Sequence, residues 1–351
     1  MKWTSAISTQ DEIDSCVEKT IQAVLDQLEG KAANLTVIFV SPHFVSSYEK
    51  IPQMIKSRMD PGILIGCSGG GIIGGGCEVE HRAAFSMTCA HLPGVDIQSF
   101  YSGGMDLPDQ DTAPGVWREW LGVKSETNPQ FVLLADPFSF RGEEFLQGLD
   151  FAYPNSIKVG GLASGANSGG GNVLYLNDKI YNGGLVGLAL SGNIAVDTIV
   201  AQGCRPIGEV LKITKCQHTL LMEVNGRPTM EVLEELLKNA NDRDRQLIRT
   251  ALFLGIEMDP LGDDPKQGDF LIRNLIGADR ESGAISIGAA LREGQLVQFH
   301  LRDKVMSAED LNLLLSKYSE TAQGAKGALL FSCLGRGEHL YGKPNHDSKL
   351  F

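Results

Sequence analysis

The chain has 351 residues, of which 41 are glycine; 42% of the residues are hydrophobic and 21% are charged. This balance excludes a disordered or collagen-like chain and provides enough apolar side chains for a large core. The formal net charge of −12 argues against a nucleic-acid-binding surface.

Membrane and secretory signals are missing from the sequence. No apolar run reaches the roughly 18 residues of a membrane-spanning helix, and the N-terminal residues lack the apolar core of a secretory signal. The seven cysteines are scattered and include no C-x-x-C pair, which argues against a zinc ribbon or a disulfide framework. We therefore expect a cytoplasmic protein without a membrane span.

The first predicted elements form a strand–helix–strand unit. The residues TQDE at 9–12 predict a helix start, and apolar residues recur at helical spacing from Ile13 to Leu28. The elements that follow are a strand at 35–40, a helix near 52–59, a strand at 63–65, a glycine-rich loop at 66–76, and strands at 83–89 and 95–101. The short β-branched runs indicate buried strands.

The same succession then recurs. It comprises a strand at 131–134, a helix at 141–151, a strand at 157–159, a glycine-rich loop at 160–171, and strands at 173–176, 185–190 and 195–201. Set side by side, VIFVSP…ILIGCSGG…GGG matches VLLADP…IKVGGLASG…GGG. We interpret the match as an internal duplication of about 35–101 and 131–201.

The character of the chain changes from about residue 202. The predicted elements are strands at 211–214 and 219–224, a helix at 228–237, strands at 252–256, 270–272, 285–289 and 296–301, a helix at 307–321, and a strand at 328–331. The fold class is therefore α/β (α+β), with mixed β-sheets sandwiched by helices and a second α/β part. Three segments are expected: an N-terminal helix (1–34), a duplicated domain (35–215) and a C-terminal domain (216–351).

The two glycine-rich loops hold thirteen of the 41 glycines. Gly69, Gly71 and Gly74 fit G-x-G-x-x-G, but no helix follows them, so a dinucleotide site is not expected. Two interpretations stay open. The loops either line one ligand pocket, or they are tight turns, bulges and close sheet contacts.

Cysteine and histidine offer a second kind of chemistry. Cys67 and Cys333 each follow a predicted strand, and His43 is the candidate base for a Cys67 nucleophile. The alternative is that both cysteines are small residues filling tight space. His43 and His81 are candidate haem ligands, although no H-x-H or H-x-x-H spacing supports a metal site.

Charged residues near the loops also have two interpretations. Arg205 and Arg336 lie in turns, where each guanidinium either binds a ligand carboxylate or holds loop carbonyls. Glu78 and Glu80 follow the first glycine loop and are expected to form a solvated edge.

These segments together resemble the FIST family (F-box and intracellular signal transduction). The resemblance rests on VIFVSPHF, IGCSGGGIIGGG, KVGGLASG, NGGLVGLALSG, VAQGCRPIGE, VNGRP, SAEDL and LLFSCLGRG, in that order, over about residues 35–342. It implies a sensory domain for a small ligand, thought to include amino acids, that is coupled to signalling or transport. No enzyme activity is attached to the family, and one branch resembles haem-carrying nitric-oxide sensors.

The resemblance points to motif positions as ligand-binding candidates: Ser41, His43, Cys67, Ser68, Gly69, Gly70, Ala163, Ser164, Gly165, Arg205, Cys333 and Arg336. No G-E-I-G-P segment follows the last predicted strand, so the C-terminal domain is expected to be truncated or shortened. The leading hypothesis is a small-ligand sensor with a signalling partner protein and no cofactor or metal. The alternatives are a haem-based sensor and a cysteine-dependent enzyme, and a homodimer is left open.

Overall fold

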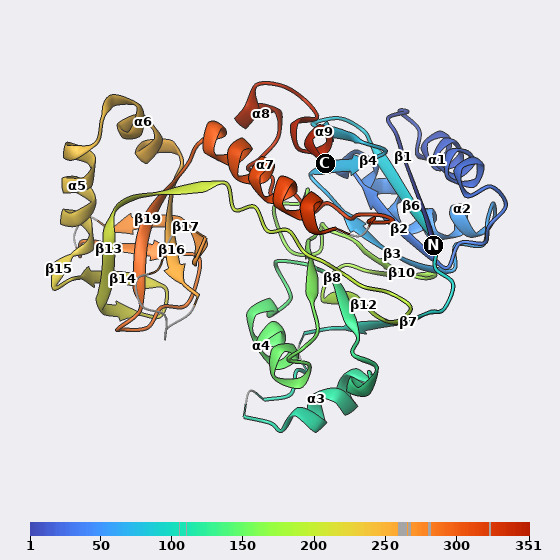
Figure 1. Ribbon diagram of the computed structural model, residues 1–351, viewed down its shortest axis with the longest axis horizontal. Helices are drawn as coiled ribbons and strands as arrows, with labels where there is room; N and C mark the ends of the chain where they lie inside the picture. The colour runs from blue at the N-terminus through green and yellow to red at the C-terminus, as the bar shows by residue number, and fades with distance from the viewer. Residues whose placement is uncertain (105, 110, 259–264, 266–267, 280–281, 323) are drawn as a thin grey trace. The chain divides into compact units, whose positions relative to one another are not determined.

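The computed structural model describes the chain except for residues 105, 110, 259–264, 266–267, 280–281 and 323 (Figure 1). The chain divides into two units. Unit 1 contains residues 1–198 and 322–351, and unit 2 contains residues 199–321. Helices and mixed sheets occur together, so the expected α+β class is confirmed.

The first sheet of unit 1 has the strand order β1-β6-β2-β3-β10-β11. Its strands are β1 (Lys2–Ser8), β2 (Leu35–Val40), β3 (Ile63–Ser68), β6 (Phe85–His91), β10 (Leu174–Leu176) and β11 (Lys179–Tyr181). β2 and β3 are parallel, and the other neighbours are antiparallel. The outer face packs against α1 (Ile13–Leu28), the 3₁₀ segment η1 (Pro42–Lys50) and α2 (Ile51–Lys56).

The second sheet of unit 1 has the strand order β7-β12-β8-β9. Its strands are β7 (Val95–Ser102), β8 (Gln130–Ala135), β9 (Lys158–Leu162) and β12 (Leu185–Gly192). β8 and β9 are parallel, whereas β12 is antiparallel to both β7 and β8. The outer face packs against α3 (Pro114–Leu121) and α4 (Gly142–Ala152).

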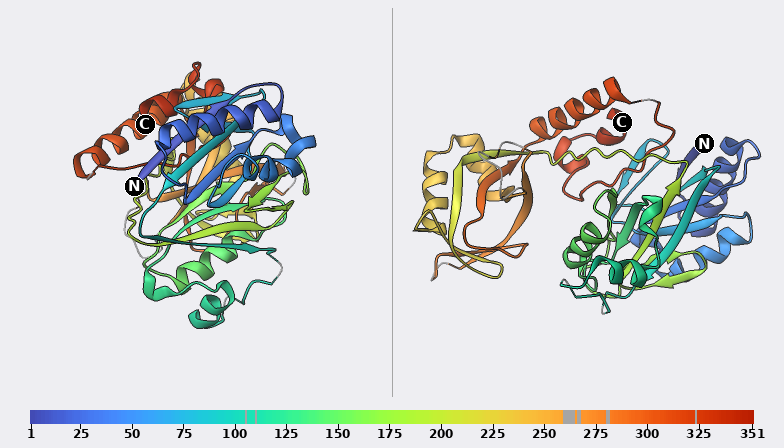
Figure 2. Two further views of the ribbon diagram at one scale, coloured as in Figure 1. Left: turned by 90° about the vertical axis from the view of Figure 1, so that its right-hand side faces the viewer. Right: turned by 60° about the horizontal axis from the view of Figure 1, so that its bottom comes forward.

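The inner faces of the two sheets share one hydrophobic core. It joins Val37 and Ile65 of the first sheet to Leu134 and Val186 of the second. Unit 1 is therefore a four-layer sandwich, with helices outside and two sheets inside (Figure 2). This burial on both faces explains why the central strands read as continuous apolar runs.

The two halves of the sandwich share one element order. The first runs β1-α1-β2-α2-β3-β4-β5-β6, and the second runs β7-α3-β8-α4-β9-β10-β11-β12. The hairpin of the first half, β4 (Gly71–Gly74) with β5 (Cys77–Glu80), forms its own two-stranded sheet. The hairpin of the second half, β10–β11, joins the first sheet beside β3. Strand β7, which the sequence places at the end of the first copy, belongs to the sheet of the second half.

Unit 2 is built on an antiparallel sheet that closes on itself, because β13 pairs with both β19 and β14. Its strands are β13 (Cys204–Gln217), β14 (Leu220–Val224), β15 (Arg227–Pro228), β16 (Leu252–Glu257), β17 (Phe270–Asp279), β18 (Ala284–Ile287) and β19 (Leu296–Arg302). Its helices are α5 (Thr229–Asn239), α6 (Asp242–Thr250) and α7 (Lys304–Thr321). Leu254, Ile287 and Phe299 lie in the core of this sheet.

Some elements differ from the sequence prediction. Residues 195–201 form no strand; they include the boundary between the two units. Residues 328–331 are also not a strand, although they contribute Leu329 to the inner core. Strand β1 was not predicted, because its buried residues Thr4, Ala6 and Ser8 are small or polar and give no apolar alternation.

Candidate functional site

The two glycine-rich loops meet in unit 1. The loop after β3 and the loop after β9 exchange two hydrogen bonds: the Ser164 N–H donates to the Ser68 carbonyl (3.1 Å), and the Gly70 N–H donates to Ser164 Oγ (3.0 Å). Gly165 lies against the ring of Pro42 at a φ of +105°, which favours glycine. The duplication of the fold therefore brings equivalent loops into direct contact.

A small cleft lies beside this contact, with a volume of about 120 Å³. It is lined by Phe39, Cys67, Ser68, Gly69, Gly71, Ile73, Leu134, Gly161, Leu162, Ser164, Leu330, Phe331, Ser332 and Leu334. Within the described part of the chain, none of these lining residues has a charged side chain. The cleft is smaller than the roughly 300 Å³ at which sites for drug-sized ligands begin, so it suits a small uncharged group.

A buried chain of hydrogen-bonded polar side chains, which we call the polar chain, holds Ser68 of the first loop. Ser68 Oγ donates to Asn172 Oδ1 (3.3 Å), and Asn172 Nδ2 donates to Asp136 Oδ1 (3.0 Å). Ser139 Oγ donates to the other carboxylate oxygen of Asp136 at 2.7 Å. Ser68, Asp136 and Asn172 are at most 1% exposed. Asp136 and Asn172 were not selected as site residues from the sequence. Asp136 could have been found, because it precedes a proline at the end of a strand in the second copy, as Ser41 does in the first.

Ser41 and Ala163 have structural contacts. Ser41 Oγ accepts from the Ala84 N–H at 2.9 Å and is buried. The Ala163 N–H donates to the Ala135 carbonyl at 2.8 Å, which extends the pairing of β8 with β9. Neither residue lines the cleft. Their roles as ligand contacts stay predictions.

The cysteine candidates occupy opposite environments. Cys67 is 4% exposed and lines the cleft, and burial raises the pKa of its thiol to about 12. The thiol form therefore dominates near neutral pH, which is unfavourable for a nucleophile. Cys333 is exposed, and its Sγ accepts from the Gly335 N–H at 3.3 Å. Among the described residues, no hydrogen bond joins Cys67 to His43.

The histidine candidates do not fit an enclosed haem site. His43 lies in η1 and His81 in the turn after β5; both are exposed, and neither lines the cleft. In the described ranges, no three His, Cys, Asp or Glu side chains are grouped so as to hold a metal ion.

The two arginine candidates lie in different units, and both have acidic partners. In unit 2, Arg205 forms an ion pair with Asp244, and its Nε lies 3.8 Å from Asp303. In unit 1, Arg336 binds both carboxylate oxygens of Asp347, at 2.6 and 3.0 Å. Each guanidinium therefore has a carboxylate partner within the protein, which neither interpretation from the sequence included. The roles of Arg205 and Arg336 as ligand contacts stay predictions.

The Arg336–Asp347 pair belongs to the C-terminal strap, which we define as residues 327–351. The strap includes α8 (Glu338–Tyr341) and α9 (His346–Leu350). His346 Nδ1 lies 2.9 Å from Asp347 Oδ1. The ring of His346 stacks on the ring of Tyr341, with 3.6 Å between the ring centroids. Four strap residues, Leu330 to Ser332 and Leu334, line the cleft.

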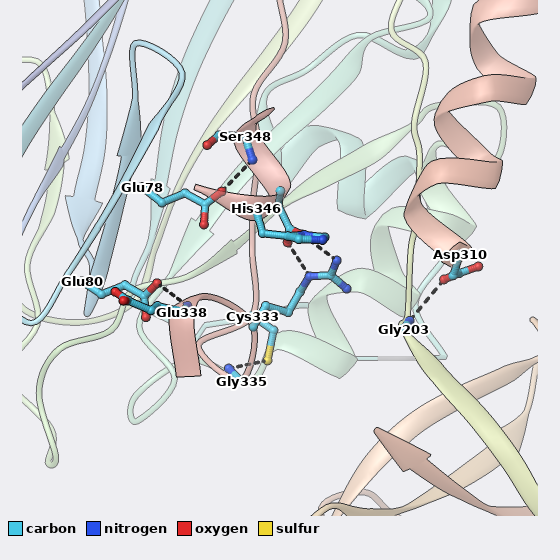
Figure 3. A network of polar contacts seen from close by, with 11 residues as sticks. Glu78, Glu80, Gly203, Asp310, Cys333, Gly335, Glu338, His346 and Ser348 are labelled. Carbon is cyan, nitrogen blue, oxygen red and sulfur yellow. Dashed lines mark hydrogen bonds and ion pairs between the residues drawn. The ribbon is translucent and has the colours of Figure 1, made fainter. Parts of the chain in front are cut away.

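Hairpin β4–β5 holds the strap through two carboxylates. Glu80 Oε1 accepts from the N–H of Glu338 (3.0 Å), and Glu78 Oε1 accepts from the N–H of Ser348 (2.6 Å) (Figure 3). The Glu78 N–H in turn donates to Asn345 Oδ1 at 2.6 Å. The expectation of a solvated edge was therefore wrong. It failed because the partners lie more than 250 residues away in sequence, beyond the range of local patterns.

The comparisons with known proteins agree with this architecture. The FIST N domain model matches residues 34–227, and the FIST C domain model matches residues 229–351. The chain belongs to the FIST family. The division into units differs from the two FIST matches in two places. Residues 199–227 of the FIST N match belong to unit 2, and residues 322–351 of the FIST C match belong to unit 1.

Relatives of this FIST protein occur in mycobacteria. The uncharacterized protein Rv0628c of Mycobacterium tuberculosis is 31% identical over 343 residues, which cover 97% of this chain and 88% of the relative. The uncharacterized protein Mb0898c of Mycobacterium bovis is 31% identical over 342 residues, with 97% and 86% covered. In the described part of the FIST chain, no helix is both long and apolar enough to cross a bilayer.

The strap is expected to lose stability in acid. Burial disfavours the charged form of Asp347, but its bonds to Arg336 and His346 outweigh this and hold its pKa below the usual 3.8. Because the pKa of Asp347 is lower in the folded state, its ionised carboxylate stabilises the fold above pH 3.8. This stabilisation is lost as the pH falls through the pKa of the folded state. Near pH 6, the wild type should have a higher melting temperature than Asp347→Asn. The difference between the two melting temperatures should shrink below pH 3.8. A difference unchanged down to pH 2, or one equal to that of the exposed control Asp11→Asn, would contradict this.

Proposed function

We propose that the protein is a sensory protein that binds a small ligand in the inter-sheet cleft of unit 1 and passes the signal to a partner protein. The family membership supports a sensory, signal-transducing role. The observation that carries the site is the meeting of the two glycine-rich loops, through Ser68, Gly70 and Ser164, beside a cleft that both loops line. Sites for small molecules are typically clefts lined by apolar side chains and a few polar groups, and this cleft has such a lining.

The residues that line the cleft indicate which kind of chemical group can enter it. Phe39, Leu134 and Phe331 offer apolar surface, whereas Ser68 and Ser164 offer hydroxyl groups. A charged group in this lining loses its hydration without gaining an ionic partner, which is costly. The group is therefore small, uncharged and mainly apolar. An amino acid meets this condition when its apolar side chain enters the cleft and its charged groups remain at the rim.

The experiment is a thermal-shift screen with amino acids and neutral metabolites, preceded by native mass spectrometry for a molecule that copurifies. Isobutanol and protonated isobutylamine serve as a size-matched pair of probes, with binding measured by NMR. We expect isobutanol to bind and the ammonium probe to bind at least about tenfold more weakly, since desolvating a charge without a partner costs more than 1.4 kcal/mol.

A cleft-filling variant assigns binding to this site. Leu162 lines the cleft and is 64% exposed, so Leu162→Trp fills the mouth without overpacking the core. We expect the variant to weaken isobutanol binding at least about tenfold. The matched control is Leu146→Trp, an exposed position on α4 that does not line the cleft. Equal binding by wild type and Leu162→Trp would refute the site.

A further inference from the structure

The C-terminal strap is a wall of the cleft that belongs to no sheet. Residues 327–333 lack the strand pairing that fixes the other walls, yet Leu330, Phe331 and Ser332 line the cleft. The ring of Phe331 packs edge-on against Phe39, with 6.3 Å between ring centroids. A segment held by side-chain packing and a few anchors opens at a lower free-energy cost than a strand inside a sheet.

The anchors of this wall lie on the element that forms another wall. Gly71 and Ile73 of β4 line the cleft, and Glu78 and Glu80 of β5 hold the strap. The strand register pairs Gly71 with Glu80 and Ile73 with Glu78. Residues that are directly opposite, or two apart on one strand, share a face of a hairpin.

The opposite face of the hairpin is fixed. Ile72 and Val79 are buried, and they pack with Ala84 in a small core of their own. One face of the hairpin is therefore held against the first sheet. The other face carries both cleft-lining residues and both anchor carboxylates, so a shift that reaches Gly71 or Ile73 also reaches the anchors.

We propose that hairpin β4–β5 couples ligand occupancy of the cleft to docking of the C-terminal strap, with Glu78 and Glu80 as positioning residues. The strap is then the element that changes state when the ligand binds, and its exposed surface is the output of the sensor. This inference rests on the proposed function for the ligand. Because coupling is reciprocal, a bound ligand stabilises the docked strap, and a released strap weakens ligand binding.

Alkylation of Cys67 by iodoacetamide tests the anchors without a ligand. Cys67 lines the cleft, whereas Cys16 and Cys89 lie in the outer core and report global unfolding. Peptide mass spectrometry gives the rate at each cysteine. In Glu78→Ala/Glu80→Ala we expect Cys67 to react at least about tenfold faster, since two hydrogen bonds to charged acceptors are lost. The rates at Cys16 and Cys89 should stay unchanged.

The matched control is Glu18→Ala/Glu49→Ala, which removes the same charge from exposed positions. The conservative Glu78→Gln/Glu80→Gln keeps neutral acceptors and should give an intermediate Cys67 rate. An unchanged Cys67 rate in the alanine variant, or an equal rise at all three cysteines, would overturn the assignment of the anchors.

Hydrogen exchange tests the coupling itself, with isobutanol as the probe. At saturation we expect exchange of the Glu338 and Ser348 amides to slow at least about threefold in wild type, and to remain unaffected in Glu78→Ala/Glu80→Ala. If isobutanol protects Cys67 in wild type but leaves strap exchange unchanged, the coupling is wrong and the ligand site stands. If the anchor variant exposes Cys67 but isobutanol protects nothing, the proposed ligand class and site fail, whereas the anchors stand.

Discussion

Gly66→Ala is expected to lower the free energy of unfolding of unit 1 by about 2–3 kcal/mol. Gly66 lies in β3 opposite Ile38 of the parallel strand β2. A Cβ atom at this position would overlap the Ile38 carbonyl oxygen, so the two central strands would have to separate. Urea unfolding followed by tryptophan fluorescence measures this loss, because Trp3, Trp117 and Trp120 are the three tryptophans of the chain and all lie in unit 1.

The second half of the fold allows an independent test of whether the close approach of two parallel strands requires glycine. Gly160 is the equivalent residue of β9, and a Cβ there would overlap the Leu133 carbonyl of β8. Gly160→Ala should therefore destabilise unit 1 to a similar extent. The control is Gly142→Ala at the start of α4, where nothing lies within 4 Å of the new atom. If Gly66→Ala and Gly142→Ala unfold at the same urea concentration, the close approach of β2 and β3 is not a constraint.

Asp136→Ala is the second change with a large expected effect, a loss of about 2–4 kcal/mol. The carboxylate of Asp136 is fully buried and accepts from Asn172 Nδ2 and Ser139 Oγ. Its removal leaves these two donors without their acceptor in the interior, which costs their desolvation energy. Urea unfolding checks the magnitude, with the exposed Asp11→Ala as the control.

A double-mutant cycle measures how much of the stability comes from the interaction between Asp136 and Asn172 rather than from each residue alone. Asp136 and Asn172 form one network that ends at Ser68, so Asn172→Ala should cost less free energy in the Asp136→Ala background than in wild type. Free energies that add within about 0.5 kcal/mol would show that the two residues act independently. That result would contradict our interpretation that the polar chain holds Ser68 in place at the cleft.

The central strands and the glycine-rich loops were predictable because their constraints are local. LTVIFV and FVLL are buried on both faces, so their own composition indicates strands. Gly66 and Gly160 are required by a neighbouring strand that follows the same short pattern in each copy. The repeated spacing therefore indicated both the duplication and the loops that line the cleft.

The remaining parts of the site depend on contacts that no local pattern records. The anchor of Ser348 on Glu78 spans 270 residues, and the bond of Ser68 to Asn172 spans 104. Hydroxyl, amide and carboxylate groups at such distances carry no periodic signal, so the strap and the polar chain were not predicted. The run ALLF at 328–331 resembles a strand by composition, but it pairs with no strand among the described residues.

The place of hairpin β10–β11 also bears on how the protein is made. These strands belong to the second half of the sandwich, but they complete the first sheet by pairing with β3. During synthesis, β3 is therefore a bare edge strand until the ribosome has released the chain beyond Tyr181. Such late, long-range closure slows folding and leaves an aggregation-prone intermediate on the nascent chain. The first half therefore cannot complete its sheet before the hairpin of the second half has been synthesised.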